Sequence, residues 1–143
     1  MPKFEEPFDS TKSVFKAVID FTELHKVLTF DIITNNKLRE VFKTAKTNDY
    51  EKHRTGVDIK IFINEEVFEM LDEVQQNIVV EEALAYVEYN YEKDTVKINK
   101  PDVMGHSGVI GKFGDKLYLN TLTIIKEAFN SLKEQKEVEG AEA

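Results

Sequence analysis

The sequence predicts an α+β domain that is mostly helical, with a small sheet formed by strands near residues 57–64 and 95–99. Three observations predict this fold class. The chain has 143 residues, of which 41% are hydrophobic, so it can bury one core and is expected to form a single domain. The segment VDIKIFIN alternates apolar and polar residues with the period of a strand. Two further segments, 14–24 and 118–137, carry apolar residues at helical spacing.

The composition excludes several classes of protein. The chain has 27 acidic and 19 basic residues and a formal net charge of −8, which argues against a nucleic-acid partner because phosphate contacts need a basic surface. It has no cysteine, which removes disulfides, thiolate nucleophiles and sulfur-based zinc sites. No apolar run approaches the length of a membrane span and no signal peptide is evident, so we expect a soluble, intracellular protein with no membrane partner.

The first half of the chain predicts a flexible arm followed by helices. Residues 1–10 contain two prolines and mixed charges, and Ser10 or Thr11 is expected to cap the helix that follows. The segment VLTFDII is compatible with a short strand or with a continued helix. NNKLREVFKTAK predicts a short amphipathic helix, and TNDYEKHRTG predicts a polar loop.

The second half begins with the strand VDIKIFIN. Asn64 and Asp72 are each expected to cap a helix, so residues 65–90 predict two consecutive helices. The strand TVKIN follows, and after it comes a segment with a glycine at every third position from 105 to 114. The last segment predicts an amphipathic helix with Leu122, Ile125, Phe129 and Leu132 on one stripe. The predicted organisation is an arm at residues 1–10, one domain at 11–136 and a disordered acidic tail at 137–143.

Two stretches carry a specific pattern, INEEVFEMLDEVQQNIVVEEALAYV and KINKPDVMGHSGVIGKFG. Together, over residues 57–114, they resemble the metallopeptidase domain family of bacteriophages, which is a small zincin-like family. That family has a lead-in of the form I…W…L…Q, an HELxH zinc helix, a strand, and a segment HDV-EF…V…R-YG with a further histidine. The matching positions here are Ile63, Phe68, Leu71, Gln76, Asp102, Val103, Val109, Lys112, Phe113 and Gly114.

The zinc ligands that the resemblance implies are missing. Where the family has His-Glu-x-x-His, this chain has Glu81, Glu82, Ala83, Leu84 and Ala85, and the later histidine falls at Pro101. The resemblance makes Glu82 a vestigial general-base position, and it makes Glu81, Ala85 and Pro101 lost ligand positions. A catalytic zinc ion needs about three protein ligands. We therefore expect no metal, no cofactor and a pseudoenzyme that is not a peptidase.

Two interpretations of Glu81 and Glu82 remain open. Carboxylates suit Mg²⁺, Mn²⁺ or Ca²⁺, so a site centred on Glu82 could be rebuilt with help from Glu88, Glu92, Asp94 or Asp102. The simpler interpretation is a solvated strip on one helix, because consecutive helical residues point about 100° apart and do not easily face one ion. His106 is expected to be a loop histidine rather than part of a cluster.

These observations predict a non-enzymatic bacteriophage protein that acts through protein–protein contacts. It would be a virion structural or accessory component, or a small effector in the host cytoplasm that binds a phage or host protein, and a homo-oligomer is compatible with the sequence. The candidate partner-binding residues are Phe4, Phe8, Tyr86 and Tyr89. The alternative is a metal-dependent hydrolase with a rebuilt carboxylate site around Glu82.

Overall fold

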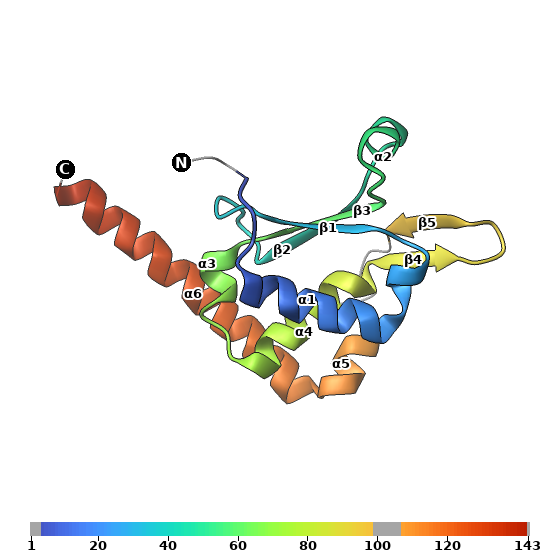
Figure 1. The fold of residues 1–143 in the computed structure, drawn as a ribbon. Helices are drawn as coiled ribbons and strands as arrows, with labels where there is room; N and C mark the ends of the chain where they lie inside the picture. The colour runs from blue at the N-terminus through green and yellow to red at the C-terminus, as the bar shows by residue number, and fades with distance from the viewer. Residues whose placement is uncertain (1–3, 99–106, 143) are drawn as a thin grey trace.

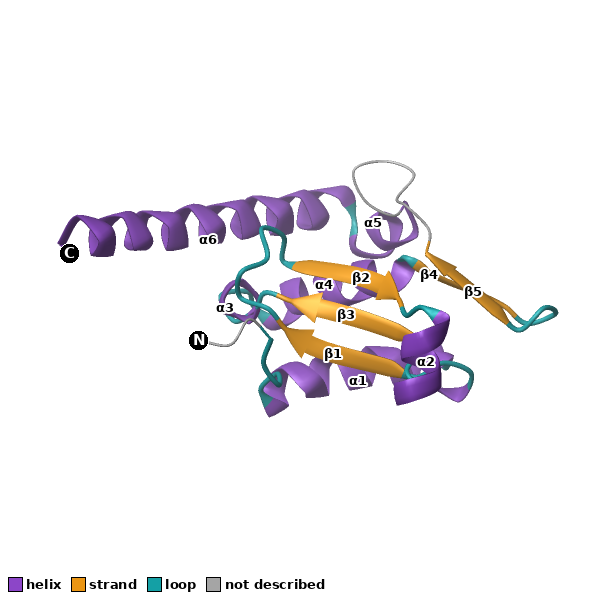
Figure 2. Cartoon of the chain, turned by 90° about the horizontal axis from the view of Figure 1, so that it is seen from above, coloured by secondary structure: helices purple, strands orange, loops and turns teal. Residues whose placement is uncertain are grey.

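A three-stranded sheet lies over a layer of helices, with a two-stranded hairpin beside it (Figure 1). This computed structural model describes residues 4–98 and 107–142. Helices α1 (Asp9–Thr22) and α4 (Glu73–Ala85) run beneath the sheet, as the view from above also shows (Figure 2). The predicted α+β class, mostly helical with a small sheet, is confirmed. No helix among these described residues is both long and apolar enough to cross a membrane.

The sheet has the strand order β1-β3-β2, formed by β1 (Phe30–Thr34), β2 (Phe42–Lys46) and β3 (Ile59–Ile63). The central strand β3 is parallel to β1 and antiparallel to β2. Ile59, Ile61 and Ile63 are each 0% exposed, because β3 turns this face toward the helices. The predicted strand and its alternation are confirmed, and the ambiguous segment VLTFDII forms β1 rather than more helix.

The main core joins this inner face to the helices. From α1 it takes Phe15, Val18 and Ile19, and from α4 it takes Val79, Val80, Ala83 and Leu84. Phe68, at the end of the short helix α3 (Glu65–Phe68), places its ring 6.0 Å from that of Phe15. The apolar side of α4 is therefore fixed by core packing alone.

The two helix caps predicted after β3 are confirmed. The Asn64 side chain accepts a hydrogen bond from the Val67 N–H at 3.3 Å and begins α3. Asp72 accepts from the Gln75 N–H at 2.8 Å and the Gln75 side chain accepts from the Asp72 N–H, which completes a capping box at the start of α4.

The predicted continuation of this helix to Asn90 is wrong. Helix α4 ends at Ala85, and the next residues form β4 (Val87–Asn90), which pairs antiparallel with β5 (Thr95–Ile98). Val87 lies opposite Ile98 and Tyr89 opposite Val96, so β-branched and aromatic side chains pair across the hairpin. The predicted strand near residues 95–99 is confirmed as β5 for its described part.

The C-terminal part of the chain forms α5 (Ser107–Phe113) and α6 (Asp115–Glu142). The predicted stripe on α6 is confirmed, because Ile125, Phe129 and Leu132 pack on the main core and Leu122 packs on a second cluster. That second cluster is centred on Ile78, Val109 and Tyr118. The last part of α6 projects away from the packed body (Figure 1), so fraying of residues 137–143 stays a prediction although the backbone is helical to Glu142.

The end of the expected N-terminal arm is attached to the domain. Glu5 and Thr34 exchange two backbone hydrogen bonds of 2.9 Å at the edge of β1. The Phe8 N–H donates to Glu65 Oε2 at 2.9 Å, and Glu65 is only 3% exposed. Residues 4–8 therefore lie along the domain rather than extending freely from it.

The predicted cap of α1 at Ser10 or Thr11 is wrong. The helix begins at Asp9 and its N-cap position is Phe8, which makes no side-chain capping bond. The Glu65 carboxylate holds the Phe8 N–H at the N-cap position. The helix therefore starts at Asp9, before Ser10 and Thr11.

Two further elements differ from the prediction. Residues 35–46 contain strand β2 rather than a helix, because Phe42 and Thr44 face the core in register with β3. Residues 47–56 contain helix α2 (Asp49–Thr55) rather than a loop. Asn48 accepts from the Glu51 N–H at 2.8 Å, and Gly56 ends the helix in the left-handed conformation with φ 74°.

Candidate functional site

Helix α4 carries the adjacent acids Glu81 and Glu82. Their side chains lie against different helices, α5 and α6. Glu82 is 7% exposed and is associated with Tyr118 on α6. The Glu81 side chain is 15% exposed and is associated with Lys112 on α5. The expectation of a solvated strip is wrong, because α5 and α6 cover this part of α4. The divergence of the two side chains follows from the helical rotation of about 100° per residue.

Glu81 forms an ion pair with the Lys112 ammonium through Oε1. Its second oxygen, Oε2, is buried and has no hydrogen-bond partner among the described residues. The Lys112 Nζ atom lies 5.4 Å from the ring centroid of Phe21 and 5.4 Å from that of Phe113. Both distances fall within the range of a cation–π contact. One carboxylate and two aromatic rings thus surround this ammonium group.

Two cavities border the Glu81–Lys112 pair. One of about 260 Å³ lies between α1, α4 and α5, and Ala17, Phe21 and Asn77 contribute to its walls. The other, of about 230 Å³, is lined by Thr22, Leu24, Leu84, Ala85 and Val109. Glu81, Val18 and Lys112 line both cavities. Glu81 and Ala85, at which the resemblance implies the first two ligand positions, therefore line the same cavity.

Glu82 belongs to a separate group of polar atoms. The Tyr118 side chain is 3% exposed, and its hydroxyl lies beside the Glu82 carboxylate. Burial, followed by the charge and the hydrogen bond of Glu82, raises the pKa of Tyr118 well above its usual range. Burial first, and then the charges of Glu82 and Glu40, also raise the pKa of Tyr86. In both tyrosines the shift favours the neutral phenol in the folded protein.

The residues at the lost ligand positions do not fit a zinc ion. Ala85 has no donor atom, and the Glu81 oxygen that is directed to α5 already accepts from a cation, Lys112. Pro101 lies outside the described residues. Across residues 4–98 and 107–142, no three His, Cys, Asp or Glu side chains are grouped closely enough to hold a metal ion. No step of chemistry is therefore assigned to a metal here.

The additional acids proposed for a rebuilt site lie elsewhere. Glu88 pairs with Lys97 at 3.1 Å across the β4–β5 hairpin, and Asp94 accepts a hydrogen bond from the Tyr89 hydroxyl at its tip. Glu92 lies in the turn between these strands. Asp102 and His106 lie outside the described residues. Glu88 and Asp94 thus have partners within the hairpin, and no group of acids that could hold a metal ion is found among the described residues.

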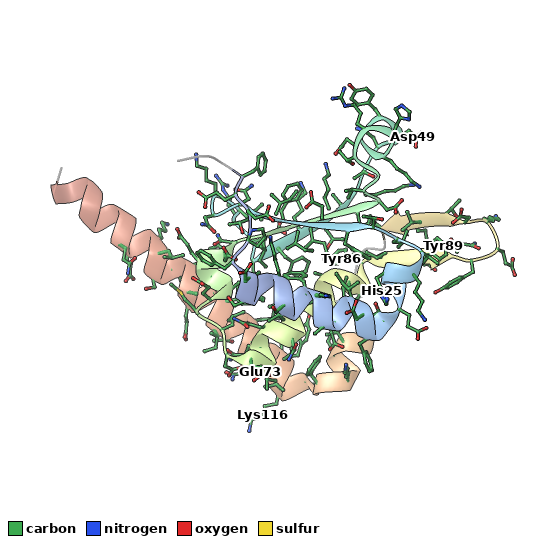
Figure 3. The ribbon with its side chains drawn as sticks, in the orientation of Figure 1. His25, Asp49, Glu73, Tyr86, Tyr89 and Lys116 are labelled. Atoms are coloured by element: carbon green, nitrogen blue, oxygen red, sulfur yellow. The ribbon has the colours of Figure 1, made fainter. Side chains whose placement is uncertain are left out.

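The four candidate partner-binding residues fall in two places. Phe4 is 52% exposed and packs its ring 5.7 Å from Phe62, and Phe8 is 57% exposed at the start of α1. Tyr86 and Tyr89 lie where α4 meets the hairpin (Figure 3). Tyr86 contacts Phe42 edge-on at 5.8 Å and is only partly exposed. Phe4 and Phe8 are therefore the more accessible pair.

Three residues of this region were not singled out as site residues from the sequence, namely Phe21, Lys112 and Tyr118. Each lies on a different helix from Glu81 and Glu82, and Lys112 is 31 residues from Glu81. Lys112 entered only as a matching position in the family resemblance. Helical periodicity gives no signal for such contacts, because it relates residues within one helix and not residues on two.

Comparison with known families gives one match. The family model described as "Putative phage metallopeptidase" matches residues 6–135, which is most of the chain and more than the 57–114 of the resemblance. No curated protein and no solved structure matches the chain.

Proposed function

Because the chain belongs to the phage metallopeptidase family, we propose that it is a phage protein which keeps the family's α+β domain but acts through protein contacts and not as a peptidase. The observation that carries this proposal is the Glu81–Lys112 ion pair at the first ligand position. A site prepared for a zinc ion would offer lone pairs to it. Here the position offers a carboxylate that is already paired with a cation, and Ala85 offers no lone pair.

The surroundings of Glu82 support the same proposal. A general base in a metallopeptidase acts on a metal-bound water whose pKa the ion has lowered. Glu82 is 7% exposed and lies beside the hydroxyl of the buried Tyr118. This geometry suits a structural carboxylate that joins α4 to α6.

Phe8 is the proposed anchor for a protein partner. Its ring is 57% exposed, while its backbone N–H is fixed by the buried Glu65 carboxylate. An exposed aromatic group on a fixed backbone contributes apolar area to an interface at little cost in conformational entropy. The partner we propose is a phage or host protein, which would make this chain a virion structural or accessory component or a small effector in the host cytoplasm.

Metal analysis with thermal melts tests the non-enzymatic part of the proposal. A bound ion in 100-fold excess over its Kd would stabilise the protein by about 2.7 kcal/mol. For 143 residues this is a rise in Tm of about 9 °C. We expect no stoichiometric ion and no such shift when EDTA, Zn²⁺ or Mn²⁺ is added. A stoichiometric ion with metal-dependent peptide hydrolysis would overturn the proposal in favour of a hydrolase with a rebuilt site around Glu82.

Site-specific photo-crosslinking tests the proposed contact. A photo-reactive phenylalanine analogue at Phe8 should crosslink one defined protein during infection. The same analogue at Tyr50, which is 68% exposed on α2, serves as the matched control. Crosslinks of the Phe8 variant in purified virions would indicate a virion component, whereas crosslinks found only in infected cells would indicate an effector. Equal crosslinking at both positions would reject Phe8 as a contact residue.

A further inference from the structure

We propose that Glu81, Phe21 and Phe113 form a binding site for a primary alkylammonium group, which the side chain of Lys112 occupies as a tethered ligand. This inference goes beyond the proposed function, because it assigns a binding chemistry to the groove between α1, α4 and α5. It depends on the described contacts of Lys112 and not on whether the protein has an enzymatic activity.

The contacts of the ammonium define the ligand class. One side of Nζ meets the Glu81 carboxylate, which supplies a hydrogen-bond acceptor and a negative charge. Phe21 and Phe113 each present a ring at 5.4 Å, which supplies the aromatic face that attracts an organic cation. A divalent metal ion would instead seek several oxygen or nitrogen donors. The combination therefore favours an alkylammonium ion over Zn²⁺ or Mg²⁺.

The two cavities beside the pair give the ligand room. They measure about 260 and 230 Å³ and share Val18, Glu81 and Lys112 in their walls. Glu81 Oε2 is buried without a hydrogen-bond partner among the described residues, so the carboxylate has unused acceptor capacity. The Lys112 side chain is 52% exposed and reaches the carboxylate from the solvent side. Shortening this side chain would leave a path by which a small amine could enter from solution.

Position 81 is where this chain departs from the family pattern. The resemblance already places a basic residue at the position of Lys112, whereas it places a histidine at the position of Glu81. The carboxylate at position 81 converts a neutral ligand position into an acceptor for the ammonium. The two positions should therefore be coupled energetically in this chain.

Chemical rescue of a shortened lysine tests the inference. Lys112→Ala should lower the Tm at pH 7 by about 3–6 °C. On the order of 100 mM n-propylammonium chloride should recover at least half of that loss, whereas the same concentration of NaCl should not. Neither salt should change the relative Tm of the Lys97→Ala control, which removes an exposed pair with Glu88 on the hairpin.

The variant Glu81→Gln/Lys112→Ala separates binding at this site from a general salt effect. Rescue by n-propylammonium should be absent in this double variant, because the carboxylate is gone. Equal stabilisation of the single and double variants, or no rescue of Lys112→Ala, would overturn the inference. Zinc uptake by the unmodified protein would bear on the proposed function instead, so the two failures are distinguishable.

A second measurement decides the matter if Lys112→Ala does not fold. Lys112→Met keeps most of the apolar stem and removes the charge. In a double-mutant cycle with Glu81→Gln, the loss of Tm caused by Lys112→Met should be at least halved in the Gln background. Equal losses in both backgrounds would show that the ammonium is not bound by Glu81.

Discussion

Replacing Tyr118 with phenylalanine removes one hydroxyl group from the α4–α6 interface and leaves the ring in place. This hydroxyl lies beside the Glu82 carboxylate, and both residues are buried. Leaving a buried acceptor without its polar neighbour costs about 1–3 kcal/mol, so we expect the free energy of unfolding to fall by about 2 kcal/mol. Unfolding of 143 residues has an entropy near 0.3 kcal/mol/K, which converts this loss to about 7 °C in Tm.

The same hydroxyl determines part of the pH dependence of stability. An unfolded tyrosine has a pKa of about 10. Burial and then Glu82 raise the pKa of Tyr118 in the folded protein, so the folded state keeps a proton that the unfolded state loses. The stabilisation is fully present below pH 10 and is lost above it, by about 1.4 kcal/mol per pH unit. The Tyr118→Phe curve should therefore fall less steeply above pH 10.

Urea denaturation followed by circular dichroism, at pH 7 and between about pH 9.5 and 11, measures both effects. Tyr91→Phe is the matched control, because Tyr91 is 71% exposed and its variant should change stability by less than about 0.5 kcal/mol. Equal urea midpoints for the two variants at pH 7 would refute a stabilising contact between the Tyr118 hydroxyl and Glu82. Parallel curves for Tyr118→Phe and the unmodified protein above pH 10 would refute the pKa argument.

Two further predictions concern backbone anchoring. Asn64→Ala should lower the free energy of unfolding in urea by about 2 kcal/mol, because it removes the cap of α3 and a 3.0 Å bond to the Leu38 carbonyl. Asn48→Ala, at the exposed start of α2, should lower it by only about 0.5–1 kcal/mol. Equal costs would contradict the role given to burial. Glu65→Ala should release the Phe8 N–H, so that hydrogen exchange speeds up at Phe8 while α4 stays protected. Unchanged exchange at Phe8 would show that Glu65 does not hold this segment.

The parts of the fold that follow from local rules could be predicted from the sequence. The alternation in VDIKIFIN identified β3, because a strand buried on one face repeats every two residues. Asn64 and Asp72 identified two helix starts, because their side chains bond to N–H groups only two or three residues ahead. Both kinds of signal lie within a few residues of sequence.

The parts that depend on distant pairing could not be predicted in the same way. The segment 35–46 has helical spacing of apolar residues, yet β3 offers it an open edge, and Phe42 and Thr44 then face the core. Val87 and Tyr89 were likewise predicted to be helical, but they lie in a strand because β5 pairs with them. Helix α2 is a different error, since Asn48 and Gly56 are local signals that were visible in the sequence.

In the candidate site, too, the features within one helix could be predicted and the contacts between helices could not. The sequence identified Glu81 and Glu82 as unusual acids and predicted their divergence, because both facts belong to one helix. Their partners Lys112 and Tyr118 are set by how α5 and α6 pack on α4, which no spacing within α4 encodes. The sequence therefore located the two acids, but it predicted neither their burial nor the residues on α5 and α6 that lie against them.

The packing of α4 explains how this helix can keep its position without histidines at the ligand positions that the resemblance implies. Asp72 fixes the start of α4, Ala83 lies against the sheet with its carbonyl accepting from Thr44 Oγ1 at 2.9 Å, and neither contact involves a metal. A catalytic ion, unlike a structural one, does not hold its fold together. Position 85 can then become alanine at little cost, whereas position 81 can become glutamate only where a cation such as Lys112 is within reach. A glutamate at position 81 should accordingly be tolerated only while position 112 carries a cation.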